Sequence, residues 1–320
     1  MSELLKIRGL SISFVLGRGL TNAVSALSFA INESEVFGLA GESGCGKSLT
    51  ALSVLGILPP SAVAEGQILF KEKNLLALKE AQMRGIRGKD ISMVFQEPMT
   101  SLNPVLTVGY QIAETLTTHY NMSKREAMDK AVELLKAVKI PSPELRVKDY
   151  PHQISGGMRQ RVMIAMAIAC NPSLLIADEP TTALDVTIQA QILDLIQGLR
   201  RDRHMSVLLI THDLGIISEQ ADRVAIMYAG RIVELADTQT IFDNPMHPYT
   251  RGLLESLPVS KGKNLRPIKG VVPSPGYLPQ GCKFSDRCGM AIAACSEKEP
   301  ELISISEKQS VRCIVTTGKA

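Results

Sequence analysis

The beginning of the chain alternates apolar and polar residues, and the later part changes to the spacing of helices. Alternation rich in β-branched residues, followed by short apolar runs, predicts strands over residues 4–14, 23–31, 36–43, 173–180 and 207–213. Apolar residues three or four positions apart, or an apolar run buried on nearly all sides, predict helices over residues 47–58, 122–138, 159–170 and 187–202. Strands that alternate with helices of this length indicate a mostly parallel α/β sheet.

The residues that flank two of these helices mark their ends. The first helix is expected to stop at Pro59 and Pro60, because proline cannot continue a helix. The second is expected to begin after Ser123, whose hydroxyl can cap it, and to end before Pro141.

The composition changes after residue 257. Gly, Pro, Lys and Ser dominate residues 258–279, and four of the six cysteines follow. We therefore expect a main domain over residues 1–257 and an extension over residues 258–320.

Composition and charge exclude several classes of protein. With 45% hydrophobic residues and a net charge of +3, the 320-residue chain is not a disordered protein, and nucleic acid is not expected as a partner. The longest uncharged run, residues 162–177, contains an Asn-Pro pair, so no membrane-spanning helix is expected. Glu3, Lys6 and Arg8 precede any long apolar stretch, unlike in a secretory signal peptide, so we expect a cytoplasmic protein with reduced thiols.

One glycine-rich segment has the spacing of a phosphate-binding loop. Residues 41–48 read GESGCGKS and match G-x-x-x-x-G-K-[ST] between a predicted strand and a predicted helix. Backbone N–H groups of such a loop surround a polyphosphate, Lys47 would reach the β- and γ-phosphates, and the Ser48 hydroxyl would bind Mg²⁺. A chance glycine turn is the alternative. The expected nucleotide contacts are Gly41, Ser43, Gly44, Cys45, Gly46, Lys47, Ser48 and Leu49.

Two acids, Asp178 and Glu179, lie at the end of a predicted apolar strand. In a P-loop nucleotidase the first acid completes the Mg²⁺ shell, and the next carboxylate polarises the attacking water. A solvated pair of acids is the alternative interpretation, but a phosphate loop upstream favours the catalytic one.

Four further motifs occur once each around these two. Ser155 to Gln160 (SGGMRQ) resembles the signature motif of ATP-binding cassette (ABC) proteins, and the Q-loop, D-loop and switch histidine of that family are matched by Gln96, residues 183–185 and His212. Residues 1–245 therefore resemble an ABC ATPase. The resemblance implies an α/β fold, a RecA-like P-loop NTPase core with an antiparallel β part, a helical subdomain at about residues 99–154 and a cysteine-rich C-terminal extension.

The resemblance also implies a role for each motif. In this family two ATPase subunits enclose ATP head to tail, and the residues implied to serve the partner's nucleotide are Ser155, Gly156, Gly157 and Asp185. The implied catalytic residues are Lys47, Gln96, Glu179 and His212, and the implied Mg²⁺ ligands are Ser48, Gln96 and Asp178. Adenine would stack on Phe14, unless that ring faces the core.

Three longer segments, residues 95–112, 150–195 and 247–258, resemble the di- and oligopeptide and nickel branch of bacterial ABC importers. This implies an ATPase subunit of a peptide importer, peripheral on the cytoplasmic side of the inner membrane. The implied partners are a second ATPase subunit (a paralogue, giving a heterodimer), two transmembrane permease subunits and, indirectly, a periplasmic or lipid-anchored substrate-binding protein. The alternatives are nickel or antimicrobial-peptide import, a soluble ABC ATPase outside transport, and an iron–sulfur redox or sensor protein with a vestigial nucleotide site.

The last four cysteines, spaced C-x5-C-x6-C-x17-C, are Cys282, Cys288, Cys295 and Cys313. Four thiolates can hold either Zn²⁺ or a [4Fe–4S] cluster. Structural zinc usually has closer C-x2–4-C pairs, so the spacing favours iron–sulfur. The tail also resembles the extension of peptide-importer ATPases, which implies such a cluster. Zinc and unliganded packing cysteines are the alternatives.

The two remaining cysteines have local interpretations. Cys170 lies on an apolar helix and is expected to pack in the core. Cys45 lies inside the phosphate loop, where positive charge would lower its pKa, but the favoured interpretation is that it fills a variable loop position.

Overall fold

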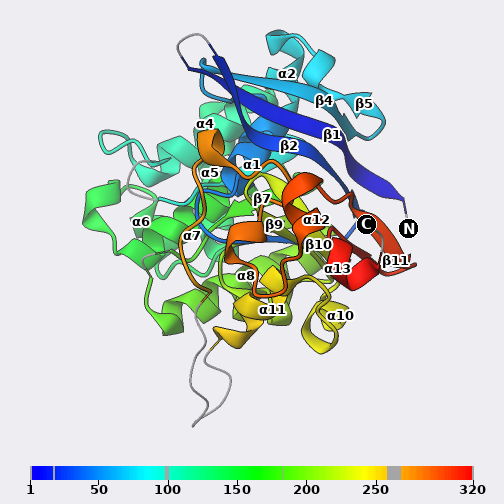
Figure 1. Ribbon diagram of the computed structural model, residues 1–320. Helices are drawn as coiled ribbons and strands as arrows, with labels where there is room; N and C mark the ends of the chain where they lie inside the picture. Colours follow the sequence, from blue (N-terminus) through cyan, green and yellow to red (C-terminus); the bar gives the residue numbers. More distant parts are fainter. Residues whose placement is uncertain (1, 17–18, 98–100, 183, 258–267, 319–320) are drawn as a thin grey trace. The chain divides into compact units, whose positions relative to one another are not determined.

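The computed structural model describes residues 2–16, 19–97, 101–182, 184–257 and 268–318 (Figure 1). The start of the expected helical subdomain, Ala183 of the expected D-loop and the start of the expected extension lie outside the described residues. The chain forms two compact units. A helical unit contains Leu78–Leu208 with Ser2 and Glu33–Glu35, and a β-rich unit contains Glu3–Asn32, Val36–Ala77 and the chain from Leu209 onward. The expected division at residue 257 stays a prediction.

The β-rich unit contains an antiparallel sheet with the order β2-β1-β4-β5. Its strands are β1 (Glu3–Leu16), β2 (Gly19–Asn32), β4 (Ala62–Phe70) and β5 (Lys73–Asn74). In the central strand β1, Ile7 lies opposite Phe29 of β2 and Ile68 of β4, and all three are buried. Alternate residues of β1 and β2 thus form one apolar face, as the sequence pattern predicts.

The strand that precedes the glycine-rich loop belongs to a mixed sheet. Within the β-rich unit this sheet has the order β11-β12-β10-β9-β3, and its strands are β3 (Val36–Ala40), β9 (Arg223–Tyr228), β10 (Arg231–Asp237), β11 (Ile303–Ser306) and β12 (Gln309–Val311). β3 and β9 are parallel, whereas the other pairs are antiparallel. The antiparallel edge departs from the expected mostly parallel sheet because two of its strands come from the C-terminal tail.

Short helices connect the strands of the β-rich unit. They are α1 (Lys47–Leu55), η1 (Leu75–Ala77), α9 (Leu214–Gln220), α10 (Thr238–Asp243), α11 (Pro248–Glu255), η3 (Pro275–Tyr277), η4 (Ser285–Arg287), α12 (Ala293–Glu297) and α13 (Ile314–Thr317). The prediction that α1 continues to Pro59 was wrong. Gly56 has a φ of 63° and donates its N–H to the carbonyls of Leu52 and Ser53, so a left-handed cap ends the helix.

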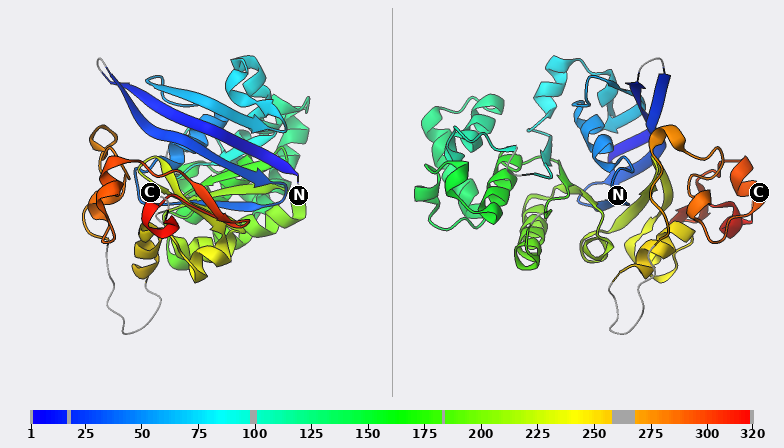
Figure 2. Two further views of the ribbon diagram at one scale, coloured as in Figure 1. Left: turned by 45° about the vertical axis from the view of Figure 1, so that its right-hand side comes forward. Right: turned by 60° about the vertical axis from the view of Figure 1, so that its left-hand side comes forward.

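The helical unit contains two parallel strands and a group of helices that pack on one another. Its elements are α2 (Glu80–Ile86), β6 (Ile91–Val94), α4 (Val108–His119), α5 (Lys124–Ala137), α6 (Pro143–Arg146), η2 (Pro151–Gln153), α7 (Gly156–Ala167), β7 (Leu174–Asp178) and α8 (Val186–Arg203). β6 pairs with β7, and α4, α5 and α7 pack on one another (Figure 2). A capping box between Ser123 and Glu126 begins α5, which confirms the predicted cap.

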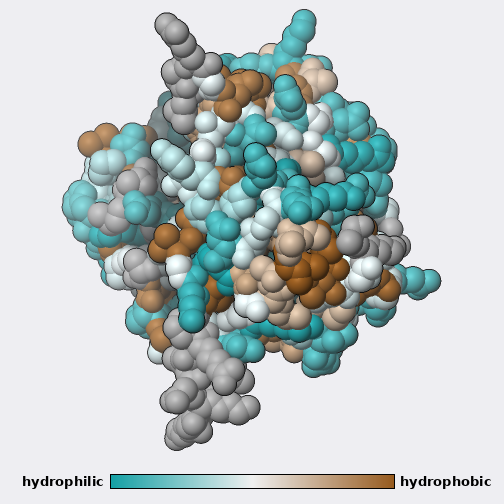
Figure 3. All heavy atoms as spheres, viewed as in Figure 1, coloured by the Kyte–Doolittle hydropathy of each residue, from teal (hydrophilic) through white to brown (hydrophobic). Residues whose placement is uncertain are grey.

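Apolar residues are concentrated in the interiors of the two units. β3, β7 and β8 (Ser206–Thr211), the strand within which the two units divide, are buried along their whole lengths. On the face drawn in Figure 3, hydrophobic side chains reach the surface in separate patches among hydrophilic ones. In the described part of the chain, no helix combines the length and the apolar character needed to cross a bilayer.

Candidate active site

The glycine-rich loop follows directly from β3. The chain turns with positive φ at Gly41 (151°), Gly44 (80°) and Gly46 (103°). A Cβ at Gly41 would lie 2.2 Å from the carbonyl oxygen of Met227, and a Cβ at Gly46 would lie 2.7 Å from Cγ2 of Val24. The loop therefore packs its backbone against β9 and β2 at positions that only glycine fits.

Lys47 begins α1 and folds back over this loop. It is 5% exposed, and its Nζ donates to the carbonyl oxygens of Gly41 at 2.7 Å and Glu42 at 3.1 Å. Gly46 precedes the helix without a side chain to cap it, so the first N–H groups and the positive end of the helix dipole face an incoming anion. Ser48 is exposed at the same end. This donor set fits a polyphosphate with Mg²⁺. Of the remaining predicted contacts, Ser43 and Gly44 are exposed and Leu49 is half-buried.

Cys45 packs inside the loop, which agrees with the favoured interpretation of a residue that fills a loop position. Its side chain is fully buried, and this burial raises the pKa of the thiol more than the neighbouring Lys47 ammonium lowers it. The Cys45 carbonyl also accepts a hydrogen bond from the N–H of Gly230 at 3.1 Å. Cys45 thus helps to anchor the loop through its buried side chain and its carbonyl group.

In the helical unit, the structure brings together Gln96 and Glu179. Nε2 of Gln96 donates to Oε2 of Glu179 at 3.1 Å, and the Thr182 hydroxyl donates to the same oxygen at 2.9 Å. Asp178 is buried at the end of β7, and Glu179 follows with a φ of 45°. Sequence reasoning missed Thr182, although its position three residues after a candidate acid was a usable signal. The result is a carboxylate held by two neutral donors just beyond β7.

The predicted signature residues form the start of α7. Ser155 is the N-cap, and its Oγ accepts from the N–H of Met158 at 3.3 Å. Gly156 is exposed and Gly157 half-buried, and a Cβ on Gly157 would lie 3.0 Å from Cγ2 of Ile188 on α8. Asp185 caps α8 in the same way, accepting from the N–H of Ile188 at 3.0 Å. Ser155 and Asp185 therefore cap two neighbouring helices of one unit.

Phe14 and His212 belong to the β-rich unit. Phe14 lies on β1 opposite Thr21 and Ala62, and it is half-buried, unlike the fully buried core residues of that strand. His212 follows β8 and is exposed. Its neighbour Asp213 caps α9 by accepting from the N–H of Gly215 at 2.7 Å.

The family of this chain follows from comparison with known proteins. The family model for the ABC transporter matches residues 24–182, and the model for the C-terminal region of oligopeptide/dipeptide transporters matches residues 233–295. The dipeptide transport ATP-binding protein DppD of Bacillus subtilis is 50% identical over 324 residues, which cover 100% of this chain and 97% of the relative. The chain belongs to the ABC transporter family.

Two further relatives and a solved ABC structure agree with this assignment. The oligopeptide transport ATP-binding protein AppD of Bacillus subtilis is 50% identical, and the match covers 98% of this chain and 97% of AppD. DppD of Haemophilus influenzae is 48% identical, with coverages of 97% and 94%. A dimeric structure of the ATP-binding cassette MJ0796 in a post-hydrolysis state with ADP and Pi is 28% identical, with a TM-score of 0.66, covering 73% of this chain and 98% of that one. The chain therefore has the ABC nucleotide-binding fold and is an ATP-binding subunit of the dipeptide/oligopeptide transporter group.

The segment that matches the C-terminal region of oligopeptide/dipeptide transporters contains Tyr249, a residue that sequence reasoning missed. Its hydroxyl accepts a hydrogen bond from the N–H of Glu42 in the phosphate loop at 2.9 Å, and burial raises its pKa. His247 is buried, caps α11 through Nδ1 and has a pKa lowered to about 3 by burial. Glu234 on β10 accepts the N–H groups of Met246 and His247 at 2.7 and 2.9 Å. The sequence His-Pro-Tyr thus places a tyrosine hydroxyl against the phosphate loop.

The four tail cysteines lie near one another. The Cys282 N–H donates to the Cys295 carbonyl at 2.7 Å. Burial, together with the smaller effect of the nearby thiols of Cys295, Cys313 and Cys288, raises the pKa of Cys282 to about 11. The described residues nevertheless contain no group of three or more His, Cys, Asp or Glu side chains placed to hold a metal ion. Four cysteine thiols are suitable ligands for an iron–sulfur cluster or zinc, but in this structure they are not arranged to bind either.

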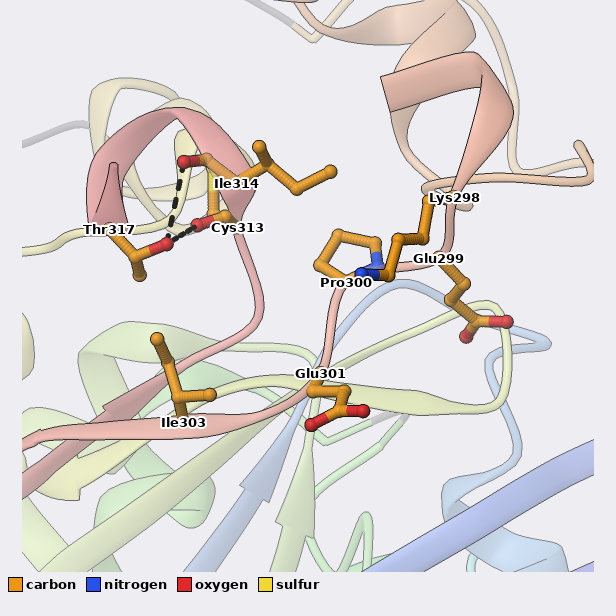
Figure 4. Close-up of a pocket in the computed structure, with 8 residues that line it drawn as sticks. All are labelled: Lys298, Glu299, Pro300, Glu301, Ile303, Cys313, Ile314 and Thr317. Atoms are coloured by element: carbon orange, nitrogen blue, oxygen red, sulfur yellow. Dashed lines mark hydrogen bonds between the residues drawn. The ribbon is translucent and has the colours of Figure 1, made fainter. Parts of the chain in front are cut away.

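A small cavity lies beside one of these cysteines, Cys313. It has a volume of about 140 Å³ and is lined by Lys298, Glu299, Pro300, Glu301, Ile303, Cys313, Ile314 and Thr317 (Figure 4). The Thr317 hydroxyl donates to the carbonyl of Cys313 at 2.7 Å and closes one side. Pockets for drug-sized ligands measure roughly 300–1,000 Å³, so this cavity is too small for a nucleotide.

The sixth cysteine, Cys170, is buried in the helical unit of the ABC fold. Its Sγ lies 3.8 Å from the carbonyl oxygen of Thr115, and burial raises its pKa to about 11. This confirms the predicted packing role.

Proposed function

We propose that this ABC protein is the ATP-hydrolysing subunit of a bacterial importer of di- and oligopeptides. The observation that carries the proposal is the 50% identity with a dipeptide transport ATP-binding protein along the whole chain. The same extent of similarity to an oligopeptide transport ATP-binding protein supports peptides of more than one length. Nickel and antimicrobial peptides remain the alternative cargoes.

The phosphate loop has the role of binding ATP. Lys47 exchanges the carbonyls of Gly41 and Glu42 for the β- and γ-phosphates, and the N–H groups at the start of α1 bind the same anion. Mg²⁺ supplies charge neutralisation on the phosphate oxygens, and the residues that would hold it are Ser48, Gln96 and Asp178. Phe14, half-buried on β1, stacks on adenine.

Glu179 has the role of polarising the attacking water. Gln96 and Thr182 both donate to its Oε2, which fixes the position of the carboxylate beside the attacking water. His212 has the role of hydrogen-bonding the γ-phosphate. In a head-to-tail dimer, the exposed start of α7 and Asp185 complete the site of the partner subunit.

The partners and location follow from the family. Two ATPase subunits, here this chain and a paralogue, work with two transmembrane permease subunits on the cytoplasmic face of the inner membrane, and a periplasmic or lipid-anchored binding protein delivers the peptide. The dimeric structures of the ATP-binding cassette MJ0796 support the paired arrangement.

The experiment is transport of a labelled dipeptide into proteoliposomes that contain the assembled importer. Wild-type subunit supports ATP-dependent uptake, and Glu179→Gln binds ATP but abolishes steady-state hydrolysis and uptake. Turnover near that of wild type in this variant contradicts the role of Glu179. Uptake of nickel but not of dipeptide assigns the importer to the alternative cargo.

The tail cysteines carry a separate part of the proposal, a [4Fe–4S] cluster or, in its place, zinc. The proximity of Cys282 to the other three thiols supports it, whereas their present geometry does not. Protein purified without oxygen should contain about four iron and four acid-labile sulfide per chain. Protein with neither iron, sulfide nor zinc refutes the proposal.

A further inference from the structure

The phosphate loop is joined to the cysteine tail by an ion pair. Nη1 of Arg287 donates to Oε2 of Glu42 at 2.7 Å, and Nη2 donates to Oε1 at 3.1 Å. Glu42 is the second residue of the loop motif, and Arg287 directly precedes Cys288. A bidentate pair of this kind fixes both the distance and the orientation of its two groups.

The guanidinium of Arg287 is itself held in place. Its Nε donates to the Lys269 carbonyl at 2.8 Å and Nη2 to the Gly270 carbonyl at 3.2 Å. The group lies 5.6 Å from the ring centre of Tyr228 and 5.9 Å from that of Phe284. Its side chain is only 6% exposed. Because these contacts already restrict the Arg287 side chain, it loses little further conformational freedom when it binds the Glu42 carboxylate.

Glu42 transmits this restraint to Lys47. The Glu42 N–H donates to the Tyr249 hydroxyl at 2.9 Å, and its carbonyl accepts from Lys47 Nζ at 3.1 Å. The side chain, N–H and carbonyl of one loop residue are therefore all engaged. The same residue joins Arg287 of the tail to the lysine of the phosphate loop.

We propose that Arg287 is a positioning residue for ATP binding, which braces the phosphate loop through Glu42 and thereby makes nucleotide affinity depend on the fold of the cysteine tail. The inference rests on ATP binding at this loop. Loss of the brace frees the first residues of the loop before the nucleotide arrives, so binding must then order them. The effect falls on ATP affinity and not on the chemical step, because Arg287 acts on the phosphate loop through Glu42.

The test compares Glu42→Gln, Arg287→Met and Arg287→Lys in the full chain. A fluorescent trinitrophenyl-ATP measures affinity on the purified subunit, and the assembled importer gives KM and kcat for ATP. Removing a partly buried bidentate pair should raise Kd and KM for ATP about three- to tenfold with kcat within about twofold. Arg287→Lys, which keeps the charge but loses the fork, should fall between wild type and Arg287→Met.

Glu80→Gln is the matched control. Glu80 forms a bidentate pair with Arg87 in the helical unit, with distances of 2.7 and 2.9 Å. This variant should leave the ATP affinity unchanged. The double variant Glu42→Gln/Arg287→Met should bind ATP no more weakly than the weaker single variant, because both remove one interaction.

The outcomes separate this inference from the proposed function. If wild type fails to bind the nucleotide, ATP binding itself is refuted. If wild type binds but Glu42→Gln and Arg287→Lys bind equally well, the brace is overturned. Equal weakening by Glu80→Gln, or additive effects in the double variant, also overturns it, since either result indicates general destabilisation. Arg287→Lys keeps the test decisive if Arg287→Met does not fold.

Discussion

Substitution of Gly41 by alanine should disrupt the phosphate loop far more than the same substitution of Gly44. Both residues have positive φ, 151° and 80°, which costs an alanine roughly 1–2 kcal/mol. At Gly44 the new Cβ meets nothing within 4 Å, so this strain is the whole cost. At Gly41 it would lie 2.2 Å from the Met227 carbonyl oxygen, more than about 1 Å inside the shortest ordinary C···O contact.

The Gly41 clash cannot be relieved by a side-chain rotation, because the obstacle is backbone of β9. β3 pairs with β9 up to Ala40 and Ile226, directly beside the clash. Moving the strands apart loses one or two ladder hydrogen bonds, each contributing about 1 kcal/mol. We therefore expect a total loss of about 3 kcal/mol for Gly41→Ala against about 1 kcal/mol for Gly44→Ala.

Thermal unfolding of the two variants measures this difference. At about 2–4 °C per kcal/mol, Tm should fall by roughly 10 °C for Gly41→Ala and roughly 3 °C for Gly44→Ala. ATP binding should be lost in the first variant and weakened in the second, where only the loop amides shift. Equal Tm values for the two variants would refute the reasoning, because they would mean that the contact with β9 does not constrain the loop.

Three further changes have defined outcomes. Thr182→Val removes one donor to Glu179 and should lower ATP turnover roughly tenfold without weakening ATP binding; unchanged turnover contradicts the role of Thr182. Ser123→Ala should cost about 1 kcal/mol in urea unfolding, and Ser123→Thr, which keeps the cap, much less; equal losses contradict the cap. Burial lowers the His247 pKa to about 3 from an unfolded value of about 6.5, so its contribution to stability is present above pH 6.5 and is lost as the pH falls toward 3. Between pH 6.5 and 5 the free energy of unfolding of wild type should therefore fall more steeply than that of His247→Asn, with slopes that differ by about 1.4 kcal/mol per pH unit. Urea unfolding at several pH values measures both slopes, and equal slopes would contradict the reasoning.

Local sequence signals predicted the elements well where neighbouring residues decide the outcome. The strand before the phosphate loop, the buried strand that ends in Asp178, and the start of α5 at Ser123 all follow from apolar runs or capping residues. The end of α1 was misjudged although its signal was local. Gly56 offered a left-handed cap three residues before Pro59, and the cap closes a helix sooner than a proline blocks it.

The parts of the site that sequence reasoning missed depend on residues far apart in the chain. Nothing near Cys45 in the sequence indicates that its side chain is fully buried, and this burial raises the pKa of the thiol although Lys47 lies close to it. Tyr249 reaches Glu42 across 207 positions of sequence, and Arg287 reaches it across 245. A motif indicates which residues take part in the chemistry. The residues that position these groups are brought to them by tertiary contacts, which a single sequence does not reveal.

The cysteine tail is the clearest case of such a contact, because it supports the phosphate loop in two ways. β12 pairs with β10, and Gln309 of β12 donates to Glu234 at 2.8 Å, the carboxylate that also holds the backbone before Tyr249. Arg287 holds the Glu42 side chain directly. Both routes converge on Glu42, one at its N–H and one at its carboxylate. Loss of structure in the tail would therefore release this residue on two sides, and ATP affinity would fall before the glycine turns of the loop themselves were altered.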